Sequence, residues 1–243
     1  AANGNILTDT LRYDIRGWLT EQRNDRFATS LHYYDPQQTA TIPSYTGNIT
    51  EWTFRHTGES SHTYAFAYDA LSRLTETKQY IDGAANDRFV EKGLTYDRNG
   101  NILTLQRTAG GTMPDNFSYT YTGNRLSALT GTASGTYDYD ANGNMTRDGV
   151  SGLNISYNRL NLIEKVERNG GILAEYSYLA DGTKCAATDD AGNGLVYVGS
   201  LVYKRQNGSY ALESAAFSGG RFVATETASG TTCLPHCFVT DHL

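Results

Sequence analysis

A short phrase recurs along this 243-residue chain, and its repetition constrains the fold more than any other feature. The phrase is a tyrosine, usually an aspartate, two turn-forming residues, and then a glycine that is often followed by asparagine. The clearest copies begin at Tyr13, Tyr96 and Tyr139, and looser copies begin at Tyr68, Tyr119, Tyr157 and Tyr178. Repetition of a fixed phrase is typical of repeat architectures, in which each copy is one supersecondary unit.

Each copy predicts a β-hairpin. An alternating segment such as 117–121 leads into the phrase, and an apolar segment such as 102–105 follows it. Aspartate accepts hydrogen bonds from the backbone that follows it, and glycine tolerates the positive φ of a tight turn. The looser copies place Ser72 and Asn161 in the glycine position, and a degenerate copy at 43–49 has Pro43 in the tyrosine position.

The residues expected to build these hairpins are Tyr13, Asp14, Gly17, Tyr68, Asp69, Tyr96, Asp97, Gly100, Tyr119, Gly123, Tyr139, Asp140, Gly143, Tyr157, Tyr178 and Gly182.

The composition indicates an all-β chain. There are 18 tyrosines and 25 glycines against 4 prolines, and no segment has a long helical period. We therefore expect repeated antiparallel β-hairpins that form a curved or spiralling strip of sheet. The Tyr-Asp phrase no longer recurs after the turn-rich segment 185–194. This change predicts a repeat region over 1–190 and a second region over 191–243.

Charge and hydropathy exclude two classes of partner. The net charge is −6 and the basic residues are scattered, so the chain lacks the concentrated basic surface that binds nucleic acid. No apolar run is long enough to span a membrane, and no signal peptide opens the chain. The first residues read as the second half of a repeat phrase, so we expect a segment of a longer protein.

The repeated Tyr-Asp-x-x-Gly phrase resembles the YD repeat of the Rhs (rearrangement hotspot) family and of related bacterial wall-associated and teneurin-like proteins. Segment 195–223 resembles the lead-in to the Rhs repeat-associated core, and Asp241, His242 and Leu243 resemble the start of its Asp-His-Leu-Gly motif. Some family members cleave themselves within that core at an aspartate-based site. Because the matching stretch would follow Leu243, no self-cleavage is expected here.

The resemblance implies a non-catalytic scaffold segment of a secreted or cell-surface protein. In such proteins the sheet builds a shell that encloses or presents a C-terminal passenger or toxin. The implied partners are the rest of the parent polypeptide and that passenger. An open strip also has unpaired edges, which predict either edge-mediated self-association or capping by terminal segments.

Two interpretations of the tyrosines stay open. They pack between neighbouring hairpins, or they stack on sugar rings as part of a carbohydrate-binding surface. Their fixed position before each turn favours packing.

Metal ligation has two weak candidates. Segment 138–143 matches the first half of an EF-hand loop, but the position of the bidentate glutamate falls on Gly149, so the turn interpretation is preferred. Cys233, His236 and Cys237, with His242 beyond them, have no familiar zinc spacing. Free thiols and a local Cys233–Cys237 disulfide remain the alternatives, and Cys185 would then be unpaired.

Catalytic signatures are absent from the sequence. The five histidines have no nucleophile-elbow context, and there is no glycine-rich phosphate loop. The sequence therefore predicts neither enzymatic activity nor a cofactor or metal site.

Overall fold

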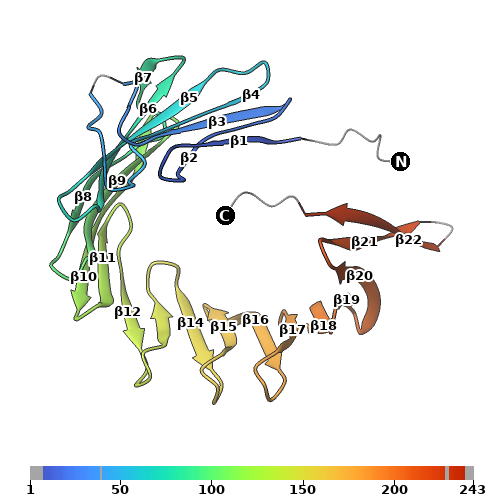
Figure 1. Ribbon diagram of the computed structural model, residues 1–243. Helices are drawn as coiled ribbons and strands as arrows, with labels where there is room; N and C mark the ends of the chain where they lie inside the picture. Colours follow the sequence, from blue (N-terminus) through green and yellow to red (C-terminus); the bar gives the residue numbers. More distant parts are fainter. Residues whose placement is uncertain (1–7, 39, 228–229, 239–243) are drawn as a thin grey trace. The chain divides into compact units, whose positions relative to one another are not determined.

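The structure is a computed structural model that describes residues 8–38, 40–227 and 230–238. These residues form strands and turns and contain no helix, which confirms the all-β prediction (Figure 1). The chain divides into two compact units that separate between Ser134 and Gly135.

Unit 1 contains β1 (Thr10–Tyr13), β2 (Leu19–Arg23), β3 (Phe27–His32), β4 (Glu51–His56), β5 (His62–Tyr68), β6 (Leu74–Ile81), β7 (Ala84–Asn86), β8 (Glu91–Tyr96), β9 (Ile102–Ala109), β10 (Thr112–Thr122) and β11 (Arg125–Gly131). Unit 2 contains β12 (Gly135–Tyr139), β13 (Met145–Asp148), β14 (Leu153–Tyr157), β15 (Ile163–Arg168), β16 (Gly171–Tyr178), β17 (Lys184–Thr188), β18 (Gly194–Val198), β19 (Leu201–Gln206), β20 (Ser209–Phe217), β21 (Gly220–Thr227) and β22 (Gly230–Cys237).

Within each unit the strands pair antiparallel in chain order. Strands β1 to β7 form one seven-stranded sheet, and β8 to β11 form a second meander in unit 1. Strands β12 to β22 continue the same up-and-down pattern within unit 2. Most of this order follows from short turns, because such a turn returns the chain beside the strand it has just left; β3 and β4 are joined by the longer connection 33–50.

Side chains join β6 to β8 in unit 1. The Glu91 N–H donates to the Thr77 Oγ1 over 2.7 Å, and the Phe89 N–H donates to the Gln79 Oε1 over 3.2 Å. Both Thr77 and Gln79 are buried, so their polar atoms take the place of a backbone ladder between these two strands.

A one-residue register shift precedes nearly every tyrosine that ends a hairpin strand. The shift lies between Arg12 and Tyr13 and recurs directly before Tyr68, Tyr96, Tyr121, Tyr139, Tyr157 and Tyr178. An extra residue of this kind is a β-bulge, which bends the strand and redirects the side chain that follows. The bulge therefore sets the direction of the tyrosine.

The two units differ in how they bury apolar side chains. Among the described residues, the buried apolar side chains all lie in unit 1: Leu19, Tyr33, Ala65, Val90, Leu94, Leu105 and Leu129. In the described part of unit 2, no apolar side chain is buried. The apolar side chains in the described part of unit 2 are therefore half-buried or exposed, and none forms a fully buried core.

The expected boundary between residues 190 and 191 falls in the turn between β17 and β18. That turn has the same backbone bonds as the repeat turns, with the Asp189 N–H donating to the Asn193 carbonyl over 2.8 Å. A functional division at this position stays a prediction.

Gly100 tests the backbone requirement of the turns. Its φ is 89°, and an added Cβ would meet nothing within 4 Å, so alanine changes only the backbone preference. We expect Gly100→Ala to lower the free energy of unfolding by about 1–2 kcal/mol. Gly100→Asn is the matched control, because Asn161 holds the same turn position at φ 58° and asparagine tolerates this region. If urea denaturation shows that Gly100→Ala and Gly100→Asn lower the free energy of unfolding equally, the turn assignment is wrong.

Candidate functional site

The repeat phrase closes a turn that is capped by its own aspartate. In the turn Asp97–Asn101, the Asp97 N–H donates to the Asn101 carbonyl over 2.9 Å, and the Gly100 N–H donates to the Asp97 carbonyl over 3.2 Å. The Asp97 Oδ1 accepts the N–H groups of Asn99 and Asn101 at 2.8 and 2.9 Å. Its Oδ2 accepts the Asn101 side-chain amide at 2.7 Å. Both carboxylate oxygens are therefore engaged inside the turn.

The other copies keep the turn and vary the cap. Asp140 repeats the Asp97 pattern with Asn142 and Asn144. Asp69 binds the Arg73 guanidinium at 2.7 Å in place of an asparagine amide. Asp14 caps its turn through the N–H groups of Arg16 and Trp18. The residue in the glycine position has a positive φ in each copy, as in Gly17 (77°), Ser72 (62°), Gly100 (89°), Gly143 (91°), Asn161 (58°) and Gly182 (87°).

Hydrogen bonds to the carboxylates lower their pKa. The side-chain amides of Asn101 and Asn144 contribute most to the lowered pKa of Asp97 and Asp140, and backbone N–H groups add to it against a partial desolvation. The Arg73 side chain contributes most to the lowered pKa of Asp69.

The tyrosine hydroxyls link each hairpin to the one before it. Tyr68 donates to the Ile49 carbonyl at 2.6 Å, and Tyr96 donates to the Leu74 carbonyl at 2.5 Å. The same bond joins Tyr157 to Met145 at 2.9 Å and Tyr178 to Ile163 at 2.8 Å. In every case the acceptor is the residue that follows the preceding repeat turn. We call this series of hydroxyl-to-carbonyl bonds the tyrosine ladder.

Burial accompanies these bonds. It raises the pKa of Tyr68, Tyr96, Tyr157 and Tyr178, because the ring and hydroxyl are partly removed from water. The tyrosines of the ladder therefore lie between hairpins, with their hydroxyls already bonded to backbone.

Two members of the ladder were missed by the sequence pattern. Tyr33 donates to the Leu19 carbonyl at 2.9 Å and is buried. It fills the position assigned to Pro43, because the chain makes an excursion after Tyr33 and rejoins the turn where the Ser44 N–H donates to the Tyr33 carbonyl at 2.8 Å. The local signal for Tyr33 was its place at the end of a strand-like segment, followed directly by the Tyr34-Asp35 pair but without the glycine of the phrase.

The expected position of Tyr119 in the phrase needs correction. Tyr121, and not Tyr119, follows the bulge and donates to the Ile102 carbonyl at 2.9 Å. Tyr119 lies earlier on β10 with its ring against Phe117, at a centroid distance of 6.2 Å. The pattern was misaligned because Gly123 and Asn124 form a shorter turn, in which Thr122 pairs directly with Arg125.

The remaining expected residues lie at the ends of strands. Tyr13 ends β1, pairs with Leu19 and is 51% exposed. Tyr139 ends β12 and pairs with Met145. Asp241, His242 and Leu243 lie outside the described residues.

Neighbouring turns are also joined to one another. The Asn124 Oδ1 accepts the side-chain amides of Asn99 and Asn101 at 2.9 and 3.1 Å. The Asn161 Oδ1 accepts those of Asn142 and Asn144 at 2.8 and 3.0 Å. These side-chain hydrogen bonds join neighbouring turns, as the tyrosine ladder joins neighbouring hairpins.

The metal candidates are not assembled as sites. The Asp140 carboxylate is used within its turn, and the nearest cation to Asp138 is Arg147 at 3.9 Å. Within residues 8–38, 40–227 and 230–238, no group of three or more histidine, cysteine or acidic side chains could hold a metal ion.

The cysteines of β22 are free and exposed. Cys233 and Cys237 lie on one face of that strand and His236 on the other, because side chains alternate. Their Cα atoms are about 13 Å apart at about 3.3 Å per residue, beyond the reach of a disulfide. The local disulfide alternative is therefore wrong for this strand.

No helix in the described part of the chain is long and apolar enough to cross a membrane.

Comparison with known proteins gives a family match. The model of the teneurin YD-shell family matches residues 42–207. A search of curated proteins finds no match. The crystal structure of TcdB2-TccC3-TEV is similar at 14% identity and a TM-score of 0.35, which does not establish a common fold. That alignment covers 99% of this chain and 16% of the other, so this chain spans a small part of that structure's length.

Tyr121 and Tyr119 provide a matched test of the ladder. Tyr121→Phe removes the donor to the Ile102 carbonyl, and we expect a loss of about 1 kcal/mol in the free energy of unfolding. Tyr119→Phe should lower the free energy of unfolding less, because Tyr121, and not Tyr119, follows the bulge and bonds to the residue after the preceding turn. If urea denaturation shows a larger loss of unfolding free energy for Tyr119→Phe than for Tyr121→Phe, the phrase begins at Tyr119 as the sequence predicted.

The capped turns predict a loss of stability in acid. The folded pKa of Asp97 and of Asp140 is lowered from 3.8, so their contribution is complete above about pH 4 and is lost as the pH falls through the folded pKa. We expect the melting temperature to fall below pH 4, and to fall less steeply in the double variant Asp97→Asn/Asp140→Asn. Identical pH profiles would show that these carboxylates do not stabilise the fold.

Proposed function

Because its residues 42–207 match the family model, the chain belongs to the teneurin YD-shell family, and we propose that it is a non-catalytic scaffold within a larger secreted or cell-surface protein. The match confirms the YD-repeat family expected from the sequence. In the parent protein this segment contributes to a β-shell that encloses or presents a C-terminal passenger. Its partners are then the rest of the polypeptide and that passenger.

The observation that carries this proposal is an apolar row across the sheet of unit 2. Ile155 pairs with Val166, Val166 pairs with Ala174, Tyr176 pairs with Ala187, and Ala187 pairs with Leu195. Paired residues of antiparallel strands share a face, and Ala174 and Tyr176 share one because side chains alternate. The row therefore consists of Ile155, Val166, Ala174, Tyr176, Ala187 and Leu195.

No described residue of unit 2 forms a second layer over this row. All six side chains are half-buried. A sheet with one apolar face is normally stable when another layer covers that face. Further polypeptide lying on the row would remove its apolar surface from water, which supports a role in holding a passenger.

The tyrosine ladder also supports a scaffold. Its hydroxyls are bonded to backbone carbonyls, so they are committed to joining hairpins. The alternative of glycan binding would need exposed tyrosines such as Tyr13, Tyr45 and Tyr210, which are 51%, 67% and 58% exposed. Glycan-array binding that is lost on replacing these three would favour that alternative.

Edge-mediated self-association stays a prediction. Strand β22 is exposed along its length and pairs with β21 on one side. Such an edge can accept another strand, and sizing of the chain at rising concentration tests this.

Protease protection of the C-terminal passenger in the parent polypeptide tests the proposed function. Val166→Glu places a charge in the apolar row, and Lys165→Glu places the same charge on the opposite face of β15. We expect limited proteolysis to release the passenger from the Val166→Glu protein at least about tenfold faster than from the wild type, which corresponds to about 1.4 kcal/mol. Lys165→Glu should leave the rate unchanged.

Melting curves of both variants separate this effect from unfolding. A passenger that is equally accessible in the wild type and in both folded variants would overturn the proposal.

A further inference from the structure

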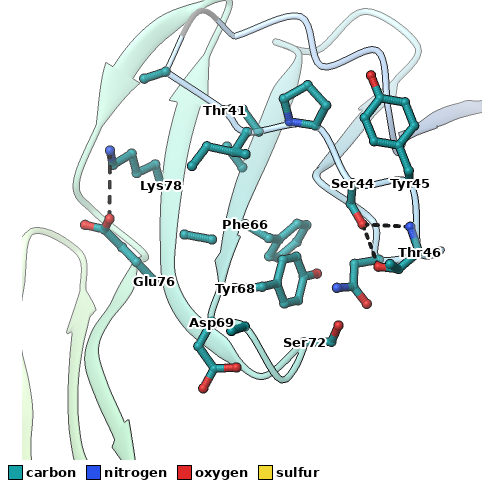
Figure 2. A pocket seen from close by; sticks show the side chains of 17 residues that line it. Thr41, Ser44, Tyr45, Thr46, Phe66, Tyr68, Asp69, Ser72, Glu76 and Lys78 are labelled. Atoms are coloured by element: carbon teal, nitrogen blue, oxygen red, sulfur yellow. Dashed lines mark hydrogen bonds and ion pairs between the residues drawn. The ribbon is translucent and has the colours of Figure 1, made fainter.

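A cavity of about 530 Å³ lies in unit 1, between the segment that contains residues 40–48 and strands β5 and β6 (Figure 2). Ala65 and Ala67 of β5 line it, and they pair with Lys78 and Glu76 of β6. These four residues share one face of the sheet. The two alanines leave a hollow that larger side chains would fill.

The segment over the hollow is fixed by a buried carboxylate. Glu51 is fully buried, and its two oxygens accept the N–H groups of Gln37 and Gln38, each at 2.7 Å. Further along, the Ser44 N–H donates to the Tyr33 carbonyl at 2.8 Å. Hydrogen bonds therefore hold the chain just before the covering segment, at Gln37 and Gln38, and the segment itself at Ser44.

Apolar residues make up part of the cavity wall, and the covering segment presents exposed apolar groups. Phe66 and Tyr68 both line the cavity, and Figure 2 shows them between Glu76 and Lys78 on one side and Ser44 and Thr46 on the other. Ile42 and Tyr45 of the covering segment are 80% and 67% exposed. Ile42 exposes most of its apolar surface beside the cavity. A ligand with an apolar body would bury that surface, so such a ligand is favoured.

The charged groups at the cavity are already neutralised. Glu76 and Lys78 lie 3.8 Å apart, and the Asp69 carboxylate binds Arg73. Ser44 and Thr46 place hydroxyls at another side of the hollow, 3.1 Å from each other (Figure 2). An uncharged ligand with hydrogen-bonding capacity suits this lining better than an ion.

We propose that this cavity binds an uncharged aromatic side chain presented by a polypeptide. The volume lies within the range of pockets that hold compact organic ligands, about 300–1,000 Å³, and three aromatic residues, Tyr45, Phe66 and Tyr68, are among the lining residues. The polypeptide source rests on the proposed function, in which the parent protein holds a passenger chain. The aromatic chemistry rests on the cavity alone.

The tripeptide acetyl-Ala-Trp-Ala-amide is the probe, and acetyl-Ala-Ala-Ala-amide is its control. We expect the tryptophan peptide to shift the amide NMR signals of residues 40–48 and 65–68 in a saturable manner. Ala67→Leu should weaken this binding at least about tenfold, because the added side chain occupies the hollow. Ala186→Leu is the matched control at a half-buried strand position of unit 2 that lies outside the apolar row, and it should bind as the wild type does.

Ile42→Ser tests the exposed part of the covering segment. It should weaken binding, whereas Ile15→Ser, at a fully exposed isoleucine of another turn, should have no effect. Melting curves establish that all four variants fold.

Three results would overturn the proposal: no saturable shifts, equal binding of the alanine peptide, or unchanged binding by folded Ala67→Leu. Binding of N-acetyltryptophanamide without the tripeptide would reject the polypeptide source and leave a small-molecule cavity. Because this experiment contains no passenger, its failure is distinct from a failure of the protease-protection test.

Discussion

The bond from a tyrosine hydroxyl to the carbonyl that follows the preceding turn is the interaction on which the rest of this structure depends. Backbone ladders already pair most of these neighbouring strands, and the hydroxyl adds a side-chain bond where two hairpins meet. Each such hydroxyl donates to a backbone carbonyl at that junction, a contribution of about 1 kcal/mol. Its repetition from Tyr33 to Tyr178 ties successive hairpins in the same way.

The capped turns add hydrogen bonds to a chain that has few buried apolar side chains. In the best copies, one aspartate accepts three hydrogen bonds and a neighbouring asparagine accepts two amides from the turn beside it. Such networks are strong only when every member is bonded. This arrangement suits unit 2, where no described apolar side chain is buried, and it leaves the apolar row available for other polypeptide.

The excursion after Tyr33 is the departure from this regular plan. It inserts chain between the tyrosine and the turn of one repeat, and the buried Glu51 binds the inserted backbone. Removing one partner of a buried charge is costly, so Glu51 fixes the inserted segment firmly. The cavity beneath that segment is a consequence of the insertion together with the small side chains of Ala65 and Ala67.

Local chemistry determined much of this protein from the sequence alone. The turn at Asp97 and Gly100 could be predicted because its cap and its positive φ involve residues within four positions of one another. The all-β class followed from the same repeats. The ladder positions of Tyr33 and Tyr121, the separation of Cys233 from Cys237 and the role of Glu51 were decided only by the tertiary structure. Each depends on strand register, on a bulge or on a partner many residues away, and a one-residue change in register turns a side chain to the opposite face.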